Sequence, residues 1–409
     1  MNWRQVPCET ETRENANGEL WLADATTADL SKWHGRVQCV YIDPPFFTGN
    51  EFYMRQRIGE KGWATGSPFV ELTAYSDIFV NKDSYLSFLR ALLEQARSLL
   101  TEEGAFFLHL DTRMDARARL LCDEIFGEKN FVNQIVWAYQ SGGRSLKRFS
   151  RKHDLILFYQ KSRALHFDLT QAPISREENR QNHMRRTVDE NGRPCRTIKS
   201  NGKTYVYYDD DPVYPGDVWT DLSHLQQKDP QRTGYDTQKP QSLLERVLKP
   251  VTRPGDIACD LCCGSGTLPV AAAALGLEFL ALDKGAPAIS VTRKRLLADK
   301  VSFTIKNASK AAPARIDARL VPGIGFFDVY LNDFEPQQAP ADGVTGLNAV
   351  DQWSAGYLDS GVFTAMTDAL RLKRSPALPP CLQLPMLRGV PAILITDIAG
   401  NRYCFACDT

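Results

Sequence analysis

The stretch YIDPPFFTG brings together an acid, two prolines and an aromatic residue directly after the apolar run VQCVYI. The apolar run is typical of a buried strand, and strands of an open α/β sheet present their C-terminal ends to a ligand crevice. Asp43 therefore supplies a carboxylate there. Pro44 and Pro45 form a stiff segment that lacks amide donors and leaves carbonyls free as acceptors. With Phe46 as a ring for stacking, the motif predicts a site for a planar group that donates hydrogen bonds.

An exocyclic amine on a flipped base, adenine in particular, suits this site. The Asp43 carboxylate and the Pro44 carbonyl can accept hydrogen bonds from the two N–H groups of the amine. These bonds free the nitrogen lone pair to attack a methyl sulfonium, while the ring of the base stacks on Phe46. The simpler interpretation is a strand-end turn, because Asp-Pro commonly starts turns. A cofactor motif elsewhere in the chain would favour the first interpretation.

Such a motif follows in DIACDLCCGSGT, a strand that runs into Asp260 and a glycine turn. Gly264 and Gly266 let the backbone approach a ligand and leave helix N-terminal amides facing it. The next strand ends in Asp283, placed to accept hydrogen bonds from a ribose diol. Pro269 replaces the third glycine of a dinucleotide fingerprint, which disfavours nicotinamide and flavin. The motif predicts a nucleoside cofactor, and a tight turn without a ligand is the alternative.

Strand and helix patterns alternate around both motifs, which indicates a parallel α/β sheet with helices on both faces. Residues 84–100 have helical spacing, and residues 113–127 form a second expected helix closed by glycine. Residues 48–80 show no clear period, and we expect a long functional loop there. A hairpin is expected around Gly400 near the end of the chain.

Composition limits the remaining classes of function. The 49 basic residues equal the 49 acidic ones, but zero net charge does not exclude a nucleic-acid partner, which depends on where the positive charge lies. No apolar run approaches the about 20 residues that span a bilayer, and the polar N-terminus is no signal peptide. The 10 cysteines lack a disulfide spacing, so we expect reduced thiols in a cytoplasmic protein. The pair Cys404 and Cys407 is far in sequence from other cysteine clusters, and we expect no metal.

These motifs resemble the amino-group DNA methyltransferases of the β arrangement, in which the catalytic motif precedes the cofactor motif. The chain is most similar to the adenine-N6 branch, including the modification subunits of type III restriction systems. The matching pieces lie in family order over residues 19–300: LADA, YIDPPFFTG, AYSD, GAFFLHLD, DEIFGEKNFVNQIVW, KHDLILFYQK, TGYDTQKPQSLLERV and DLCCGSGT. The resemblance implies a Rossmann-like methyltransferase sheet, S-adenosylmethionine as donor, and N6-methyladenine in double-stranded DNA as product.

The resemblance also implies a set of residues that line the cofactor pocket: Asp24, Thr237, Lys239, Asp260, Gly264, Gly266 and Asp283. Cys262 stands where the family has an aromatic residue, which thins one wall of the pocket. For Lys239, a solvated lysine at a helix start is the alternative. We expect four segments: a catalytic half (residues 19–161), a target-recognition region (162–234), a cofactor-binding half (235–310) and a β-rich accessory domain (317–409).

A basic, glycine-bearing loop lies between two expected strands, and we expect it to contact DNA phosphates. Its candidate residues are Arg144, Lys147, Arg148, Arg151 and Lys152. A solvated run of charge is the alternative interpretation. Polar residues of the target-recognition region, including Gln181, Asn182, Arg185 and Arg186, could read base edges.

Two other functions stay open at this point. N4-cytosine methylation uses the same geometry on another exocyclic amine, although Asp at position 43 favours adenine by resemblance. A recognition subunit with a weak cofactor site, serving a partner nuclease, is the other alternative, and Cys262 is the residue that supports it. Homodimerisation and a restriction nuclease partner are not decided by the sequence.

Overall fold

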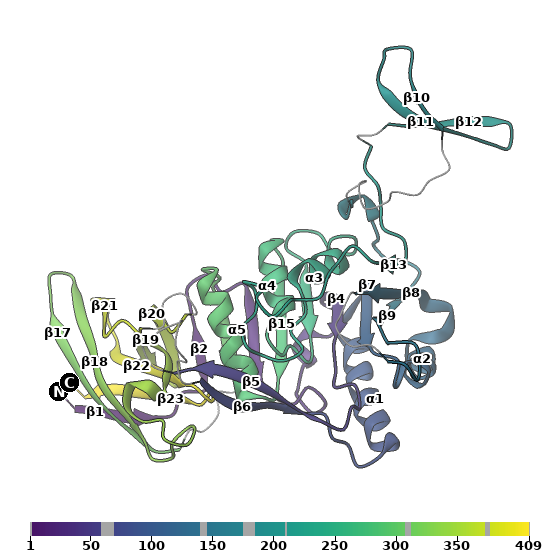
Figure 1. Cartoon of the computed structure of the whole chain (residues 1–409). Coiled ribbons are helices and arrows are strands. Elements are labelled where there is room, and N and C mark those ends of the chain that lie inside the picture. The colour runs from purple at the N-terminus through teal and green to yellow at the C-terminus, as the bar shows by residue number, and fades with distance from the viewer. Residues whose placement is uncertain are drawn as a thin grey trace.

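The computed structural model describes residues 2–58, 69–139, 145–174, 185–208, 211–306, 312–372 and 377–408. Figure 1 shows an α/β body between a β-rich unit at one end and a small projecting sheet at the other. In the described ranges, no helix is long and apolar enough to cross a membrane.

The body is built on a mostly parallel sheet. Its strands are β2 (Thr10–Thr12), β3 (Gly18–Leu22), β4 (Val37–Ile42), β7 (Leu100–Leu110), β8 (Phe131–Ala138), β9 (His153–Gln160), β13 (Val218–Trp219), β14 (Ile257–Asp260), β15 (Glu278–Asp283) and β16 (Thr304–Lys306). They are ordered β2-β16-β3-β15-β14-β4-β7-β9-β8-β13. The run from β16 to β7 is parallel, and β9 is antiparallel between β7 and β8. The expected Rossmann-like α/β fold is confirmed.

Helices cover both faces of this sheet. They are α1 (Lys82–Leu99), α2 (Asp115–Cys122), α3 (Gln241–Leu248), α4 (Thr267–Ala274) and α5 (Ala286–Ala298). A capping box starts α1, because the Asn81 side chain accepts from the Ser84 amide at 2.9 Å and Ser84 Oγ accepts from the Asn81 amide at 3.2 Å. The second expected helix, residues 113–127, is shorter than predicted, since α2 ends at Cys122 and a π-helical turn (Asp123–Gly127) follows.

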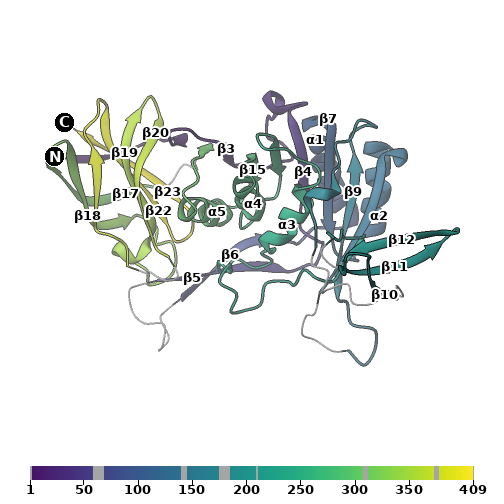
Figure 2. The same ribbon diagram turned by 90° about the horizontal axis from the view of Figure 1, so that it is seen from above.

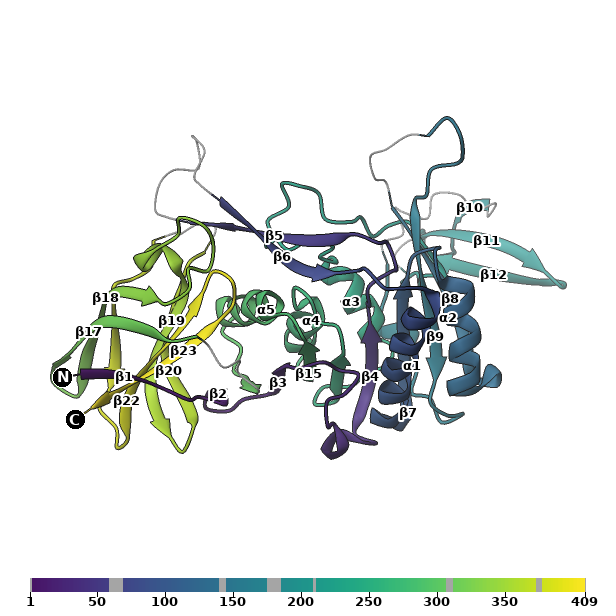
Figure 3. The same ribbon diagram turned by 90° about the horizontal axis from the view of Figure 1, so that it is seen from below.

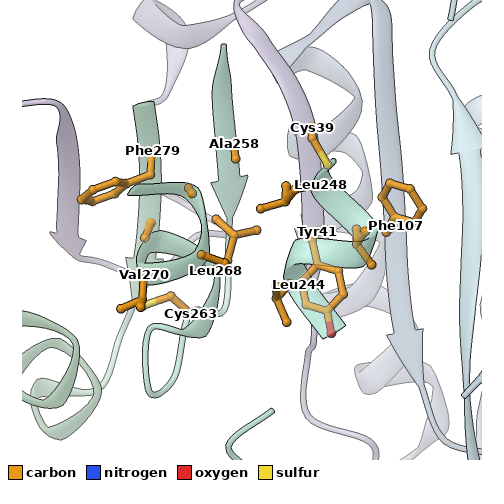
Figure 4. Close-up of a cluster of buried hydrophobic side chains, with 14 of the residues drawn as sticks. Cys39, Tyr41, Phe107, Leu244, Leu248, Ala258, Cys263, Leu268, Val270 and Phe279 are labelled. Atoms are coloured by element: carbon orange, nitrogen blue, oxygen red, sulfur yellow. The ribbon is translucent and has the colours of Figure 1, made fainter. Parts of the chain in front are cut away.

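Successive residues of a strand point to opposite faces of the sheet, and their side chains belong to two separate hydrophobic cores. In β4, Cys39 and Tyr41 face α3, α4 and α5, whereas Val40 and Ile42 face α1 and α2. Figure 4 shows part of the first core, with Leu244 and Leu248 of α3 beside Tyr41. All six residues of β4 are buried, as expected for a central strand covered on both faces.

Residues 48–80 are not the long loop that their lack of a period predicted. Strands β5 (Glu51–Arg57) and β6 (Phe69–Ser76) form an antiparallel hairpin, while residues 59–68 lie outside the described part of the chain. The hairpin extends from the β-rich unit across the body (Figure 3). Its stability comes from long-range contacts that a local pattern does not reveal.

The segment expected to recognise the target contains a separate three-stranded sheet. Strands β10 (Arg185–Val188), β11 (Pro194–Ser200) and β12 (Lys203–Tyr208) pair only with one another among the described strands. They project from the body beyond β13 (Figures 1 and 2). Apolar side chains of this sheet are exposed: Val188, Ile198, Tyr205, Val206 and Tyr207.

The β-rich unit joins both ends of the described chain. Its strands are β1 (Asn2–Val6), β17 (Ala314–Pro322), β18 (Phe326–Pro336), β19 (Val350–Asp359), β20 (Val362–Leu370), β21 (Cys381–Pro385), β22 (Val390–Asp397) and β23 (Arg402–Asp408). β1, which we had assigned to no segment, pairs with β23. The expected hairpin around Gly400 is confirmed as β22–β23. β20 pairs with β2, so one 15-stranded sheet continues from the unit into the body.

A buried ionic cluster fills the joint between unit and body. Glu11 of β2 is fully buried and accepts from Arg293 of α5 at 2.8 and 3.0 Å. Arg13 lies 2.8 Å from the same carboxylate, and Arg402 of β23 donates to its other oxygen. Burial opposes the charge of Glu11, but Arg293, Arg13 and Arg402 together hold its pKa well below the usual range. This carboxylate is saturated by cations from three parts of the chain.

Candidate active site

Four acids lie at one edge of the sheet because each ends or follows a parallel strand. Asp260 pairs with residues of β4 and β15, and Asp283 pairs with the last residue of β3. Asp43 directly follows β4, and Asp24 follows β3. All four line one cavity of about 440 Å³, within the size range of small-molecule sites. The two motifs, more than 200 residues apart, therefore meet at one site.

The turn after β4 is held by Asp77, the last residue of the AYSD motif. Its carboxylate accepts from the amides of Phe46, Phe47 and Thr48 at 3.1, 2.8 and 2.8 Å. It also accepts from the Thr48 hydroxyl at 2.7 Å, and Asp77 is only 1% exposed. These bonds stabilise a turn in which Phe47 has a φ of 61°. The AYSD motif is part of the resemblance seen in the sequence, but the role of Asp77 in holding this turn is revealed only by the structure.

Lys239 forms an ion pair with Asp43. Lys239 Nζ donates to Asp43 Oδ2, and the two side chains are 11% and 19% exposed. The ammonium also lies 5.3 Å from the centroid of the Phe46 ring. The structure thus places Lys239 within the site, on the carboxylate of the catalytic motif, and not in the solvent.

The ring of Phe46 rests on a buried polar chain. The His109 ring is stacked on it at 6.0 Å, with an interplanar angle of 24°. His109 Nδ1 is 2.7 Å from the Tyr41 hydroxyl, and Nε2 is 3.1 Å from Asp154. Burial alone would raise the pKa of Asp154, but hydrogen bonds from His109 and Tyr139 lower it. His109 therefore supports the Phe46 ring from behind through stacking, while its own two ring nitrogens contact Tyr41 and Asp154.

The glycine turn is bound by Asp283, the last residue of β15. Asp283 accepts from the amides of Gly264 and Gly285 at 2.9 and 2.8 Å. Gly264 has a φ of 49°, and a side chain there would lie 3.5 Å from the Tyr235 ring. Burial raises the pKa of Asp283 and, together with the charges of Asp43 and Asp283, raises the pKa of Asp260 well above its usual range. These carboxylates lack the cationic compensation that Glu11 has.

A ladder of aromatic rings covers the cavity. Phe52 stacks on Tyr75 at 4.8 Å, and Tyr75 stacks on Tyr235 at 6.4 Å. The Tyr75 hydroxyl lies 3.2 Å from Thr237 Oγ1, and Thr237 has a φ of 62°. Strained backbone of this kind is found where the surrounding structure holds a functional group in place. The sequence analysis assigned no role to these aromatic residues, because the strands of Phe52 and Tyr75 were not expected and Tyr235 lies outside the named strands.

The other predicted residues differ in their placement. Pro44, Pro45 and Cys262 line the cavity, and Cys262 is half-buried. Gly266 belongs to the turn but not to the cavity lining; a side chain there would lie 2.4 Å from Thr292, so packing against α5 requires glycine.

Most of the basic loop can be placed as well. Lys147, Arg148 and Arg151 are exposed and Lys152 is half-buried, in the segment that leads into β9. Arg144, like Gln181 and Asn182, lies outside the described residues. None of these four residues of the basic loop lines the cavity. Over the same described ranges, no group of at least three His, Cys, Asp or Glu side chains is arranged to hold a metal ion.

This fold and site define a class of nucleoside-binding α/β proteins, and comparison with known families narrows it. The family model described as "DNA methylase", for N6 and N4 amino methylation, matches residues 37–294, which is more than half of the chain. The chain belongs to this family.

Curated relatives agree with the family. The EcoPI Mod subunit, a type III restriction-modification protein of Escherichia phage P1, is 28% identical over 241 residues, or 51% of this chain and 37% of that protein. The type II methyltransferase M.EcaI of Enterobacter cloacae is 24% identical over 326 residues, or 68% and 69% of the two chains. The match thus spans well under half the length of the Mod subunit.

Solved structures include similar folds at low identity. PvuII DNA methyltransferase (cytosine-N4-specific) is 13% identical with a TM-score of 0.46, covering 71% of this chain and 90% of that one. The M1.HpyAVI–SAM complex is 16% identical with a TM-score of 0.41, covering 68% and 98%. The fold assignment for this chain rests on its own strand order.

The residues present fit S-adenosylmethionine, the cofactor implied by the family. Both Asp283 oxygens are fixed by backbone amides and keep lone pairs for ribose hydroxyls. A side chain at Gly264 would occupy space beside Tyr235. The cavity combines these polar groups with apolar and aromatic walls, as an adenosyl group requires.

Proposed function

We propose that the chain transfers a methyl group from S-adenosylmethionine to the N6 amine of an adenine flipped out of double-stranded DNA. The observation that supports this most directly is the shared cavity. It holds the Asp43-Pro44-Pro45-Phe46 turn on one side and the Gly264–Asp283 cradle on the other. A methyl acceptor and a nucleoside cofactor could meet there.

The chain's own residues would act on the amine as hydrogen-bond acceptors and as a plate. Lys239 donates to Asp43 Oδ2 and fixes that oxygen, so Oδ1 and the Pro44 carbonyl oxygen accept hydrogen bonds from the two N–H groups of the amine. The base stacks on Phe46, which His109 supports. The cofactor supplies an electrophilic methyl sulfonium. Closing the cavity with the base and the aromatic ladder would exclude water from the reacting groups.

Adenine is the base we propose, and N4-cytosine is the alternative. Both amines fit two acceptors and a plate, so the geometry of the site does not separate them. Asp at position 43 favours adenine by resemblance to the N6 branch.

DNA would lie along the sheet edge that carries the cavity. Its path would include the exposed basic residues before β9, and the projecting β10–β12 sheet would contact the target sequence. Such a protein would act in the cytoplasm, at the nucleoid. A type III modification subunit such as EcoPI Mod is a relative, and partnership with a nuclease in a restriction-modification system is part of this proposal.

The deciding experiment is methyl transfer from labelled S-adenosylmethionine to mixed-sequence genomic DNA, followed by separation of the product nucleosides. N6-methyladenine supports the proposal, and N4-methylcytosine would keep the mechanism but change the base. No product and no cofactor binding would favour the recognition-subunit alternative, with Cys262→Phe as the next variant.

The DNA path can be tested by charge. Replacing Lys147, Arg148 and Arg151 with Gln should weaken DNA binding and reduce the slope of log K against log salt by roughly 0.9 for each lost phosphate contact. A control with Arg315, Arg319 and Arg388 of the β-rich unit changed to Gln should keep the wild-type slope. An unchanged slope in the first variant would place the DNA elsewhere.

A further inference from the structure

The hairpin β5–β6 connects the β-rich unit to the active site, and the family match at residues 37–294 leaves that unit without a role. Near one end of the hairpin, Val70 and Ile58 pack against the core of the β-rich unit. At the other end, Asp77 directly follows β6 and holds the catalytic turn. Tyr75 and Phe52, between these ends, line the cavity. One strand therefore contacts the unit, the cofactor side and the catalytic turn in succession.

A buried polar contact fixes the hairpin to the unit. Gln56 of β5 donates through Nε2 to Asp351 Oδ1 of β19, and the two residues are 8% and 2% exposed. Lys294 of α5 donates to the same carboxylate oxygen. Asp351 thus binds the hairpin and the helix that follows Asp283 at a single point. Because both partners are buried, the loss of this bond would remove a direct link between the hairpin and the unit, while Lys294 would still donate to Asp351.

The hairpin also holds the segment that carries Lys239. The Arg55 amide donates to the Gly234 carbonyl at 3.0 Å, and the Asp236 amide donates to the Tyr53 carbonyl at 3.0 Å. The approach is so close that a side chain on Gly234 would lie 2.4 Å from the Arg55 carbonyl oxygen. Movement of β5 would therefore move the backbone that leads to Lys239 and its partner Asp43.

We propose that the β-rich unit is a positioning element for methyl transfer, which holds the β5–β6 hairpin over the cavity through Asp351, Gln56 and Val70. The inference rests on the proposed function for its readout in activity. Gln56 and Asp351 are positioning residues, since they touch neither the cavity nor the reacting groups. We call these contacts the tether. Without the tether, Tyr75 and Phe52 in the wall of the cavity would no longer be held in place, and neither would the turn that Asp77 binds.

The test compares Gln56→Leu and Val70→Ser with wild type in the full chain. Gln383→Leu is the control, because Gln383 also donates to an acid of the unit, Asp328 at 3.4 Å, and this exposed bond joins β21 to β18 within the unit. Amide hydrogen exchange should become faster in residues 51–57 and 69–76 of both tether variants and stay unchanged in α1. The affinity for S-adenosylhomocysteine should fall about tenfold, as expected for a lost hydrogen bond to a charged acceptor.

Three readouts decide the proposal. Binding stoichiometry should stay at the wild-type value while Kd rises and kcat falls, because a merely structural defect would lower the competent fraction at unchanged Kd. Unchanged exchange in the hairpin would overturn the tether, and faster exchange with unchanged Kd and kcat would overturn the positioning role of the unit. A wild-type protein that neither binds S-adenosylhomocysteine nor transfers methyl would overturn the proposed function instead, and the exchange data would still decide whether the tether exists.

Discussion

Asp260 and Asp283 of the cavity and Glu11 of the joint are carboxylates whose pKa values are shifted in opposite directions. Burial and mutual repulsion raise the pKa of Asp260, and burial raises that of Asp283. Three arginines overcome the burial of Glu11 and lower its pKa. Three arginines therefore outweigh burial at Glu11, whereas the lysines near Asp260 and Asp283 do not outweigh burial at those two acids.

The difference separates a structural carboxylate from a functional one. A saturated acid stabilises the fold and has no capacity left for a ligand. An undercompensated acid destabilises the ligand-free protein, which suits a site whose partners arrive with the cofactor or the base. Asp43 is intermediate, since a single lysine holds it.

The largest effect is expected at Asp43. Asp43→Ala removes an acceptor for the amine and should reduce kcat by at least about a thousandfold, the scale of lost electrostatic stabilisation in a closed site. Binding of S-adenosylhomocysteine, measured by calorimetry, should stay within about threefold of wild type. Wild-type rates in this variant would remove Asp43 from the mechanism.

Glu11→Gln should act on stability instead. Breaking a buried charge cluster leaves arginines unpaired and should lower the free energy of unfolding in urea by about 3–5 kcal/mol. Glu19→Gln is the control, because Glu19 pairs with Lys32 and Lys306 near the surface and its loss should cost under about 1 kcal/mol. Equal losses of unfolding free energy in both variants would contradict the claim that the Glu11 cluster stabilises the fold more than the Glu19 ion pairs do.

Asp260→Asn should change stability in the opposite direction. It relieves repulsion from Asp43 and Asp283 and keeps an oxygen for the Cys262 amide, which now donates to Asp260 at 3.0 Å. We expect the ligand-free protein to gain about 1 kcal/mol in unfolding free energy and cofactor affinity to fall about tenfold. A loss of stability would show that Asp260 is compensated after all.

The smallest expected effect is the pH dependence of two stability differences, between wild type and Glu11→Gln and between wild type and Asp260→Asn. The folded pKa of Glu11 is lowered, so its stabilisation is complete above the unfolded value of 4.5 and is lost as pH falls below it. The folded pKa of Asp260 is raised, so its penalty is complete above that raised pKa and vanishes as pH falls toward the unfolded value of 3.8. In urea titrations, the gap between wild type and Asp260→Asn should therefore begin to close at a higher pH than the gap between wild type and Glu11→Gln.

The acids of the cavity could be placed from the sequence because strand ends are local features. VQCVYI and DIACD are apolar runs that end in an acid, and parallel pairing then brings their ends to one edge. Asp77 and the aromatic ladder could not be placed in this way. Asp77 binds amides 29 to 31 residues away in the chain, across the β5–β6 hairpin, and only the tertiary structure brings these groups together.

The hairpin and β1 are formed by their partners more than by their own pattern. In the sequence, Gln56 and Val70 are ordinary strand residues. In the structure, Gln56 donates to Asp351 and Val70 packs against the core of the β-rich unit. The polar segment Asn2–Val6 becomes a strand because β23 offers it an edge. Gly266 is expected to line the cofactor pocket. In the structure, the absence of a side chain at Gly266 allows close packing against Thr292, a contact that only the tertiary structure reveals.

The Glu11 cluster also has a consequence for synthesis of the protein. Glu11 leaves the ribosome 282 residues before Arg293 and 391 residues before Arg402. The parallel sheet of the body can form while the chain is still growing, whereas the joint must wait for the final strands. Until then Glu11 has only Arg13 of its three arginine partners, and β2 lacks its neighbour β20, a state in which chaperones and proteases would have access to the segment.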